Sequence, residues 1–141
     1  MTLVLDSSAA MAIVRRSPEG RAFVRLMEKN EKVIAPQLFI AEMNSAMSKH
    51  IKAGEYTIDM AHAMLREAHN LVDEFFDMQE NYIEALDEGI RQDHSSYDMF
   101  YLTLTRRNGA TLFTLDRRLI ALCEHLEINC IHAMFVTPSC D

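Results

Sequence analysis

The chain has 141 residues, of which 49% are apolar, and this is enough to build one sizeable hydrophobic core. No stretch approaches the roughly 18 consecutive apolar residues of a membrane-spanning helix, and the first residues lack both a basic leader and a long apolar region. The three cysteines all lie near the end of the chain and do not make the paired framework of a secreted domain. These features predict one cytoplasmic domain with no membrane-spanning segment.

The formal charge of −7 argues against an ordinary nucleic-acid-binding protein, because phosphate binding normally requires a basic surface. The charge is uneven along the chain. Residues 55–98 carry 12 Asp and Glu against 2 Lys and Arg, whereas residues 1–54 carry 5 against 8. A local RNA-binding surface is therefore conceivable around four arginines near the two ends of the chain, which are Arg15, Arg16, Arg117 and Arg118. Ordinary solvated helix faces explain each of these arginines equally well.

The first elements alternate between short apolar runs and helical patterns. Residues 3–5 are expected to form a buried strand, and residues 9–14 have the composition of a helix. Ser17 and Pro18 suit the N-cap and the first position of a second helix. Residues 33–35 then form a second short strand.

Two long helices follow the second strand. The first is expected to begin at Pro36 and to run to about Ala53, where Gly54 supplies the left-handed C-terminal position. The second is expected over residues 58–76, where apolar residues recur at three- and four-residue spacing. Residues 78–82 fit either a short strand or the start of a helix.

The last third of the chain repeats the alternation of helix and strand, over residues 83–90, 95–108, 111–115, 117–124 and 128–132. Short apolar strands that alternate with helices indicate a parallel sheet covered on both faces. The sequence therefore predicts an α/β fold with three layers, α/β/α, around a mostly parallel central sheet. The domain should span residues 1–136, followed by a tail at 137–141 that has no periodic pattern.

Four carboxylates stand at positions that the predicted fold would bring together. Asp6 and Asp116 directly follow strands, and in open α/β sheets the loops at the carboxyl ends of the strands form the binding crevice. Glu42 lies about two turns into the helix after the second strand, on a face with small residues that should point inward. Asp98 opens the helix that leads to the strand at 111–115.

Four carboxylates in one crevice would repel one another, and a buried unpaired carboxylate is costly enough that it usually protonates. A divalent cation removes this cost. Mg²⁺ and Mn²⁺ prefer oxygen ligands and retain several waters, so a few Asp and Glu without Cys or His are the expected ligands. Such a centre can activate water and stabilise charge on phosphorus and the leaving oxygen, which predicts hydrolysis of a phosphodiester.

Each carboxylate also has an ordinary structural explanation. Asp6 and Asp116 suit the N-caps of the helices that follow them. Asp98 fits a capping box with Ser95, and Glu42 could pair with a nearby basic residue. Caps do not explain a glutamate on the inward side of its helix, however, so the four residues together favour a site.

The order and spacing of four segments resemble those of a known family, and the segments are Val4-Leu5-Asp6-Ser7-Ser8, residues 36–44, Tyr97-Asp98 and residues 112–119. They are similar to the PIN-domain nucleases, and in length and layout to the stand-alone VapC-type toxins of bacterial toxin–antitoxin pairs. The resemblance implies that four residues bind Mg²⁺ or Mn²⁺, namely Asp6, Glu42, Asp98 and Asp116. It also implies that Thr114 supports the site, and Ser8 and Asn44 within the same segments are further candidates for this role.

The resemblance further implies RNA cleavage, a homodimer, and inhibition by a small antitoxin protein that wraps the toxin near its active site. One position departs from the family pattern. After Asp98 the family usually has a small residue, whereas this chain has Met99, so the packing around that carboxylate should differ.

Three functions are compatible with these residues. The first is a metal-dependent endoribonuclease that acts as the toxin of a toxin–antitoxin pair. The second is a non-catalytic PIN-fold module that binds RNA or a protein, which the acidic middle of the chain and Met99 would suit. The third is a phosphoryl-transfer protein with Asp6 as nucleophile, but Ser8 stands where related phosphatases place a second aspartate.

Overall fold

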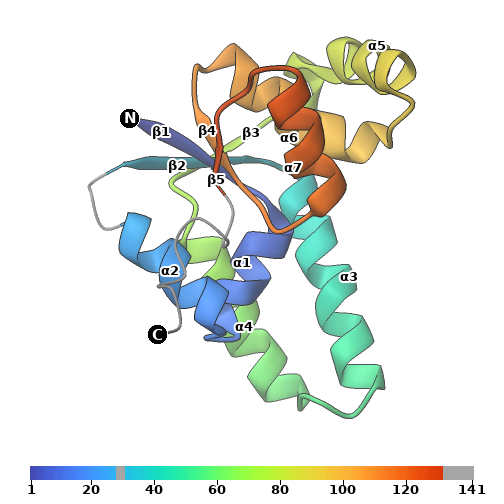
Figure 1. The fold of residues 1–141 in the computed structure, drawn as a ribbon. Helices are drawn as coiled ribbons and strands as arrows, with labels where there is room; N and C mark the ends of the chain where they lie inside the picture. Colours follow the sequence, from blue (N-terminus) through green and yellow to red (C-terminus); the bar gives the residue numbers. More distant parts are fainter. Residues whose placement is uncertain (28–30, 132–141) are drawn as a thin grey trace.

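A computed structural model describes residues 1–27 and 31–131, and in it five strands form one sheet (Figure 1). The strands are β1 (Thr2–Leu5), β2 (Lys32–Pro36), β3 (Glu74–Phe76), β4 (Thr111–Phe113) and β5 (Cys130–Ile131). Their order is β3-β2-β1-β4-β5, and all four pairings are parallel. The predicted parallel sheet is confirmed.

Helices cover both sides of the sheet, so the predicted three-layer α/β/α fold is confirmed as well (Figure 1). On one side lie α1 (Ser7–Val14), α2 (Pro18–Met27), α3 (Leu38–Lys52) and α4 (Ile58–Asn70). On the other side lie η1 (Met78–Glu80), which is a single 3₁₀ turn, α5 (Tyr82–Gln92), α6 (Ser96–Arg107) and α7 (Arg117–His125). In the part of the chain that the structure describes, no helix is long and apolar enough to cross a membrane.

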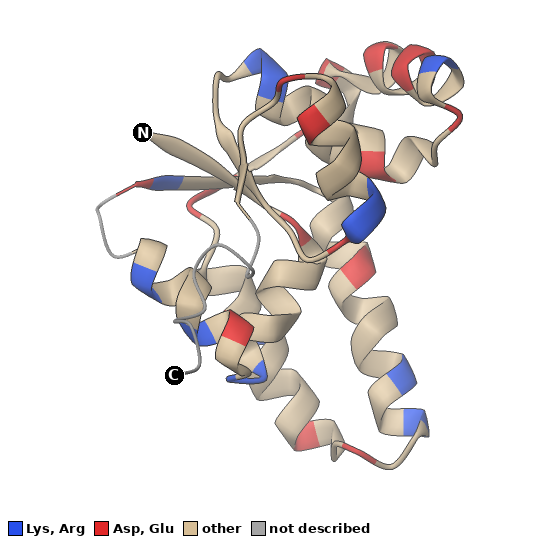
Figure 2. Ribbon diagram, viewed as in Figure 1, with Lys and Arg blue, Asp and Glu red and all other residues tan. Residues whose placement is uncertain are grey.

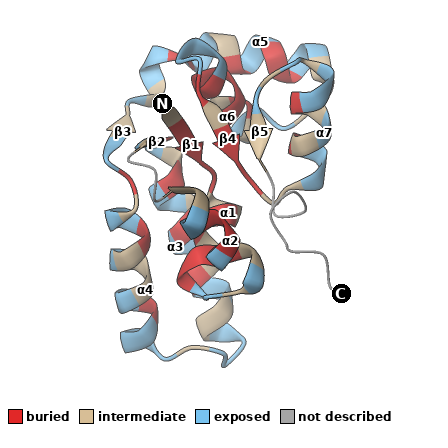
Figure 3. Ribbon diagram, turned by 60° about the vertical axis from the view of Figure 1, so that its left-hand side comes forward, coloured by how far each residue is buried: buried red, intermediate tan, exposed pale blue. Residues whose placement is uncertain are grey.

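The core lies between the sheet and the inward faces of the helices (Figure 3). Residues Leu3 to Leu5 of the central strand β1 are completely buried, because helices cover both faces of the sheet there. Phe23 of α2 packs on Phe113 of β4, with ring centroids 5.4 Å apart. The carboxyl ends of β1 and β4 are thus held in a rigid layer.

Several local signals act as predicted. The hydroxyl of Ser17 accepts the N–H of Gly20 at 3.0 Å and so caps α2 at its predicted start. Gly54 follows α3 with φ of +77°, and Gly109 follows α6 with φ of +55°. Both glycines adopt the left-handed conformation that a residue with a Cβ rarely adopts, and this is why the two helices end there.

The predicted helix over residues 58–76 was wrong only at its end, because α4 ends at Asn70 and residues 74–76 form β3. Asp73 explains the change. Its carboxylate accepts the N–H of Val33 at 2.8 Å, and its own N–H donates to the carbonyl of Val33 at 2.8 Å. These bonds attach the chain to the edge of β2, and the apolar residues that follow pack as a strand instead of a helix face.

Other predicted boundaries also differ from the structure. Pro36 ends β2 and does not begin a helix; α3 starts at Leu38. The segment 78–82, which fitted either a strand or a helix start, contains the 3₁₀ turn η1, the turn residue Asn81 and the first residue of α5. The last strand is described only as far as Ile131, so His132, the domain end at 136 and the 137–141 tail lie outside the described residues.

An ion-pair network holds α5 against α6, the helix that carries Asp98. Glu88 of α5 is 1% exposed and accepts hydrogen bonds from Arg106 of α6 and, at 3.1 Å, from Arg91. Arg106 also donates to Glu84 at 2.7 Å. The hydrogen bond from Arg106 is the main cause that lowers the pKa of Glu88.

Acid should weaken this network. Because the pKa of Glu88 is lower in the folded protein than its ordinary value of 4.5, its ionised form contributes stability above that value, and this contribution disappears as the pH falls through the folded pKa. We expect Glu88→Gln to lower the free energy of unfolding by about 2 kcal/mol at pH 7, and by much less near pH 3. Urea unfolding at several pH values measures this difference. Asp87→Asn, on the exposed side of the same helix, is the control, and a Glu88→Gln effect that is independent of pH would contradict the prediction.

Candidate active site

Asp6 lies at the carboxyl end of β1, the central strand, which pairs with β2 on one side and with β4 on the other. Crevices form at such points of parallel sheets. The side chain of Asp6 is nevertheless only 5% exposed, and its Oδ2 accepts hydrogen bonds from Thr114 at 2.6 Å and from Ser8 at 2.7 Å. Burial raises the pKa of Asp6, the two hydroxyls oppose this, and the negative charge of Asp98 adds to the rise.

Thr114 and Ser8 join the end of β1 to the end of β4. The buried hydroxyl of Thr114 donates to Asp6 and accepts the N–H of Asp116 at 3.0 Å. The hydroxyl of Ser8 also donates to Asp6, and it accepts the N–H of Leu115 at 3.0 Å. Each hydroxyl therefore accepts a backbone N–H that follows β4 and at the same time donates to the carboxylate of Asp6, which it orients.

Glu42 reaches this place from α3. Its Oε1 accepts hydrogen bonds from the phenol of Tyr101 at 2.6 Å and from the hydroxyl of Ser7 at 3.3 Å. Burial raises the pKa of Glu42, the bond from Tyr101 opposes this, and the charge of Asp6 raises it further, with a smaller contribution from Asp98. Asp6 and Asp98 are thus close enough to Glu42 to disfavour its ionisation.

Asp98 lies in the first turn of α6, and its Oδ2 is 2.8 Å from Nε2 of His94. The predicted capping box is only half formed, because Ser95 accepts the N–H of Tyr97 at 3.3 Å while Asp98 turns to the histidine. His94 lies between α5 and α6 and belongs to neither helix. Its side chain is 8% exposed and lies in the turn before α6, against the carboxylate.

Asp116 is the N-cap of α7. Its Oδ1 accepts the N–H of Arg118 at 2.9 Å and the N–H of Leu119 at 3.1 Å. The cap explanation is therefore correct for this residue. It does not exclude a role in the site, because the same cap fixes the carboxylate at the end of β4, next to the Thr114 hydroxyl that holds Asp6.

In all four carboxylates, one of the two oxygens is held by hydrogen bonds from the protein. The engaged atoms are Oδ2 of Asp6, Oε1 of Glu42, Oδ2 of Asp98 and Oδ1 of Asp116. Among the described residues, no side chain donates a hydrogen bond to the second oxygen of any of them. A carboxylate fixed in this way presents its other oxygen in a defined direction, as a ligand to a metal ion does.

These residues fit a hydrated divalent cation. The donors are carboxylate oxygens, which Mg²⁺ and Mn²⁺ prefer. A bound cation would offset the burial and the repulsion that raise the pKa values of Asp6 and Glu42. Within residues 1–27 and 31–131, no three His, Cys, Asp or Glu side chains are grouped closely enough to enclose an ion. The four carboxylates are thus more widely spaced than the ligands of a closed cage, and an ion held among them would keep several waters.

Some of the predicted site residues lie away from the carboxylates. Asn44 donates to the carbonyl of Ile40 in its own helix, at 3.3 Å. Arg15 and Arg16 follow the far end of α1, a helix of eight residues and so about 12 Å long, and Arg16 pairs with Glu67 at 3.2 Å. These three predicted residues are therefore not brought to the site by the fold.

Arg117 and Arg118, in contrast, directly follow Asp116 and are exposed at the start of α7 (Figure 2). Of the four arginines proposed from the sequence, they are the two that the fold places beside a candidate carboxylate. They could contact the phosphates of a bound nucleic acid there.

Three residues that hold the carboxylates were missed in the sequence, namely Ser7, His94 and Tyr101. A signal for Tyr101 was present, because it follows Asp98 by three residues and so shares a face of the helix with it. His94 precedes Asp98 by four residues, but it lies before the predicted helix, so this spacing was a weaker signal. Its position depends on the turn at Asp93, which has φ of +50°.

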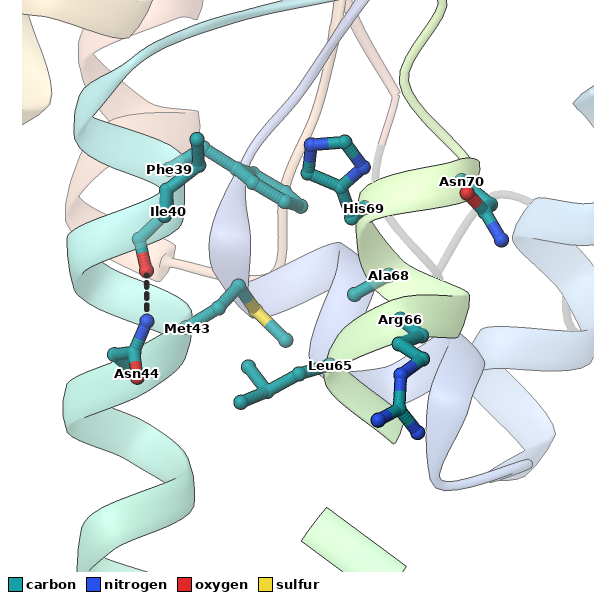
Figure 4. A pocket seen from close by; sticks show the side chains of 9 residues that line it. All are labelled: Phe39, Ile40, Met43, Asn44, Leu65, Arg66, Ala68, His69 and Asn70. Atoms are coloured by element: carbon teal, nitrogen blue, oxygen red, sulfur yellow. Dashed lines mark hydrogen bonds between the residues drawn. The ribbon is translucent and has the colours of Figure 1, made fainter. Parts of the chain in front are cut away.

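An apolar pocket lies between α3 and α4, apart from the carboxylates (Figure 4). Its volume is about 320 Å³, and Phe39, Met43 and Leu65 point into it from the two helices. Asn44 and Arg66 also contribute to its lining, but none of the four carboxylates does. This pocket is therefore not the place of the proposed metal chemistry.

Residues 3–125 match the PIN domain family, whereas no curated protein sequence matches the chain. Among solved structures, the fold is similar to that of PAE2754 from Pyrobaculum aerophilum, with 21% sequence identity and a TM-score of 0.70 over 86% of this chain and 78% of that chain. It is also similar to VapBC2 from Rickettsia felis bound to a DNA fragment from their promoter, with 17% identity and a TM-score of 0.68 over 93% of this chain and 98% of that chain. At these identities the structural similarity concerns the fold, but the family match extends over most of the sequence, and the protein belongs to the PIN domain family.

Proposed function

We propose that this protein is a metal-dependent endoribonuclease that hydrolyses RNA phosphodiester bonds in the cytoplasm, as the toxin of a toxin–antitoxin pair. The observation that carries the proposal is the set of four carboxylates, each engaged through one oxygen at the carboxyl end of a parallel sheet. PIN domains are generally nucleases, and the family match supports the same conclusion.

In this proposal, Asp6, Glu42, Asp98 and Asp116 together hold Mg²⁺ or Mn²⁺. The ion, when bound, supplies the positive charge that activates water and stabilises the charge developing on the phosphate. Thr114 and Ser8 keep Asp6 oriented, with hydrogen bonds of 2.6 and 2.7 Å. Since these contacts are already in place, little reorganisation is needed when substrate binds.

The substrate strand would be held beside this centre by Arg117 and Arg118. Both are exposed at the N-terminus of α7, where the helix dipole adds to their positive charge. Contacts to phosphates position the strand without selecting a base, so they do not define which RNA is cut.

Cleavage of structured RNA by wild type and Asp98→Asn, each with Mg²⁺, Mn²⁺ or a chelator, tests the proposal. We expect only the metal-loaded wild type to cut RNA at its full rate. The variant should be at least about 100-fold slower, because loss of a residue that only orients a metal ligand already costs up to about 100-fold. Asp93→Asn is the matched control, because it is exposed close to Asp98 and asparagine also tolerates its left-handed backbone. Full activity of Asp98→Asn, or undiminished cleavage in chelator, would exclude this mechanism.

The alternative is a non-catalytic PIN-fold module that binds RNA or a protein. The excess of acidic residues over residues 55–98 favours it, because this part of the chain would repel an RNA substrate. Met99 does not favour it, since its side chain is completely buried and lies against Gly89 of α5. This alternative requires binding without product under every divalent ion, so one cleavage product on a gel would exclude it.

We also propose a small antitoxin protein and a second copy of this chain as partners. The Rickettsia felis neighbour is a VapBC complex, which supports the antitoxin. Ile83, Leu86 and Ile90 on α5 are 53–72% exposed. The pocket between α3 and α4 is apolar as well, so each of these two surfaces could bind another protein chain (Figure 4). Light scattering of the purified chain tests the homodimer, and a monomer at all accessible concentrations would exclude it.

A further inference from the structure

We infer that Tyr101 is a positioning residue of this site, whose phenol holds Glu42 beside Asp6 and Asp98. The inference rests on the proposed metal-dependent function and assigns to Tyr101 the task of keeping one ligand in place. Tyr101 itself contacts neither metal nor substrate in this role. It acts through the carboxylate of Glu42.

The contact between Tyr101 and Glu42 is short and buried. Tyr101 is completely buried, and its phenol oxygen lies 2.6 Å from Oε1 of Glu42, the distance of a strong hydrogen bond to a charged acceptor. The phenol is the donor in this bond, because an ionised carboxylate can only accept. Ser7 donates to the same oxygen at 3.3 Å, and together the two bonds leave Oε2 of Glu42 available.

The same bond joins two helices that carry candidate ligands. Tyr101 follows Asp98 by three residues, so both project from one face of α6, whereas Glu42 belongs to α3. Within the described residues, this is the one hydrogen bond between α3 and α6. The phenol therefore sets the position of Glu42 relative to Asp98.

Glu42 needs such a restraint because its surroundings push it outward. The carboxylates of Asp6 and Asp98 carry the same negative charge as that of Glu42 and repel it. Glu42 also lines an open groove of about 480 Å³, together with Lys49 and His50. A glutamate side chain has three rotatable bonds, so without the phenol it would turn toward water and Lys49.

A purely structural role would look different. Thr103 and Thr105 on the same helix satisfy their buried hydroxyls locally, with hydrogen bonds of 2.7 Å to backbone carbonyls of α6. Tyr101 reaches instead to another helix, and to a group that repulsion would otherwise displace. The contact is therefore arranged for Glu42 and not only for the phenol.

Mn²⁺ binding to Tyr101→Phe tests the inference independently of RNA cleavage. Followed by the electron paramagnetic resonance signal of free Mn²⁺, the Kd of the variant should rise about 10-fold or more, as is typical when a group that orients a ligand is removed. Phenylalanine fills the same space, so the thermal midpoint of the metal-free protein should fall by no more than a few degrees, about 2–4 °C for each kcal/mol lost. Tyr56→Phe is the matched control, since Tyr56 is partly buried against His50 and is not placed in the site.

A second pair of variants separates positioning from packing. If Tyr101 acts through Glu42, then adding Tyr101→Phe to Glu42→Gln should change the Mn²⁺ Kd by no more than about twofold, which is the usual deviation between independent effects. An equal loss of affinity in both backgrounds, or wild-type affinity of Tyr101→Phe, would overturn the inference and leave the proposed function intact. A wild type that neither binds Mn²⁺ nor cuts RNA would overturn the proposed function, and the inference with it.

Discussion

Asp6→Asn is expected to slow RNA cleavage greatly and to make the metal-free protein more stable. Asparagine has the same shape, and its Oδ1 can accept the hydrogen bonds that Thr114 and Ser8 now donate to Asp6. The loss of one ligand charge should lower kcat/KM by about 10³-fold, equivalent to about 4 kcal/mol of transition-state stabilisation. Stability should rise because a buried charge is removed, and each kcal/mol gained raises the melting temperature by about 2–4 °C.

The stability gain should depend on pH in a defined direction. Burial raises the pKa of Asp6 above its ordinary value of 3.8, so this residue favours folding when it is protonated in acid. That contribution is lost as the pH rises through the folded pKa. The difference between Asp6→Asn and wild type should therefore be largest at neutral pH in chelator and should shrink in acid, when melting is followed by circular dichroism.

Added metal should reverse the order of stability. Mg²⁺ or Mn²⁺ that binds only the folded wild type raises its melting temperature by mass action, whereas the Asp6→Asn variant should respond weakly. Asp87→Asn, exposed on α5, should change neither activity nor stability. A variant less stable than wild type in chelator would show that the Asp6 charge is already compensated without metal.

Gly20→Ala is expected to destabilise the protein strongly, although alanine is the better helix former. Helix propensity alone would favour alanine by about 1 kcal/mol. Gly20, however, lies where α2 meets α1, and a Cβ there would overlap the carbonyl of Ala12 and lie 2.7 Å from the backbone nitrogen of Ile13. These are backbone atoms, which cannot turn aside as the end of a long side chain can.

The two helices must therefore separate, and we expect a loss of about 3 kcal/mol, with a melting temperature about 10 °C lower. Thermal and urea unfolding measure both values. Arg25→Ala, exposed on the same helix, controls for the substitution itself and should remain within about 0.5 kcal/mol of wild type. If Gly20→Ala proves as stable as wild type, the crossing of α1 and α2 relaxes without cost.

The fold class and part of the site follow from the sequence alone, because the relevant signals are local. Short apolar runs between helices require a parallel sheet, since only helices on both faces can bury such strands completely. Asp6 and Asp116 directly follow the strands β1 and β4, and parallel strands bring their carboxyl ends to one edge. The end of a helix at Gly54 is equally local, because a single residue supplies the left-handed turn.

The tertiary structure decided the features that depend on partners far away in the chain. Whether residues 74–76 continue a helix or form β3 depends on Val33, which lies 40 residues before its partner Asp73. The bond between Glu42 and Tyr101 spans 59 residues and exists only because α3 and α6 flank the same strand ends. The periodicity of either helix describes its own faces but not the distance to the other helix. The packing of the layers therefore decides which residues orient the carboxylates. It also decides that Gly20→Ala should destabilise the protein, although helix propensity alone would favour alanine.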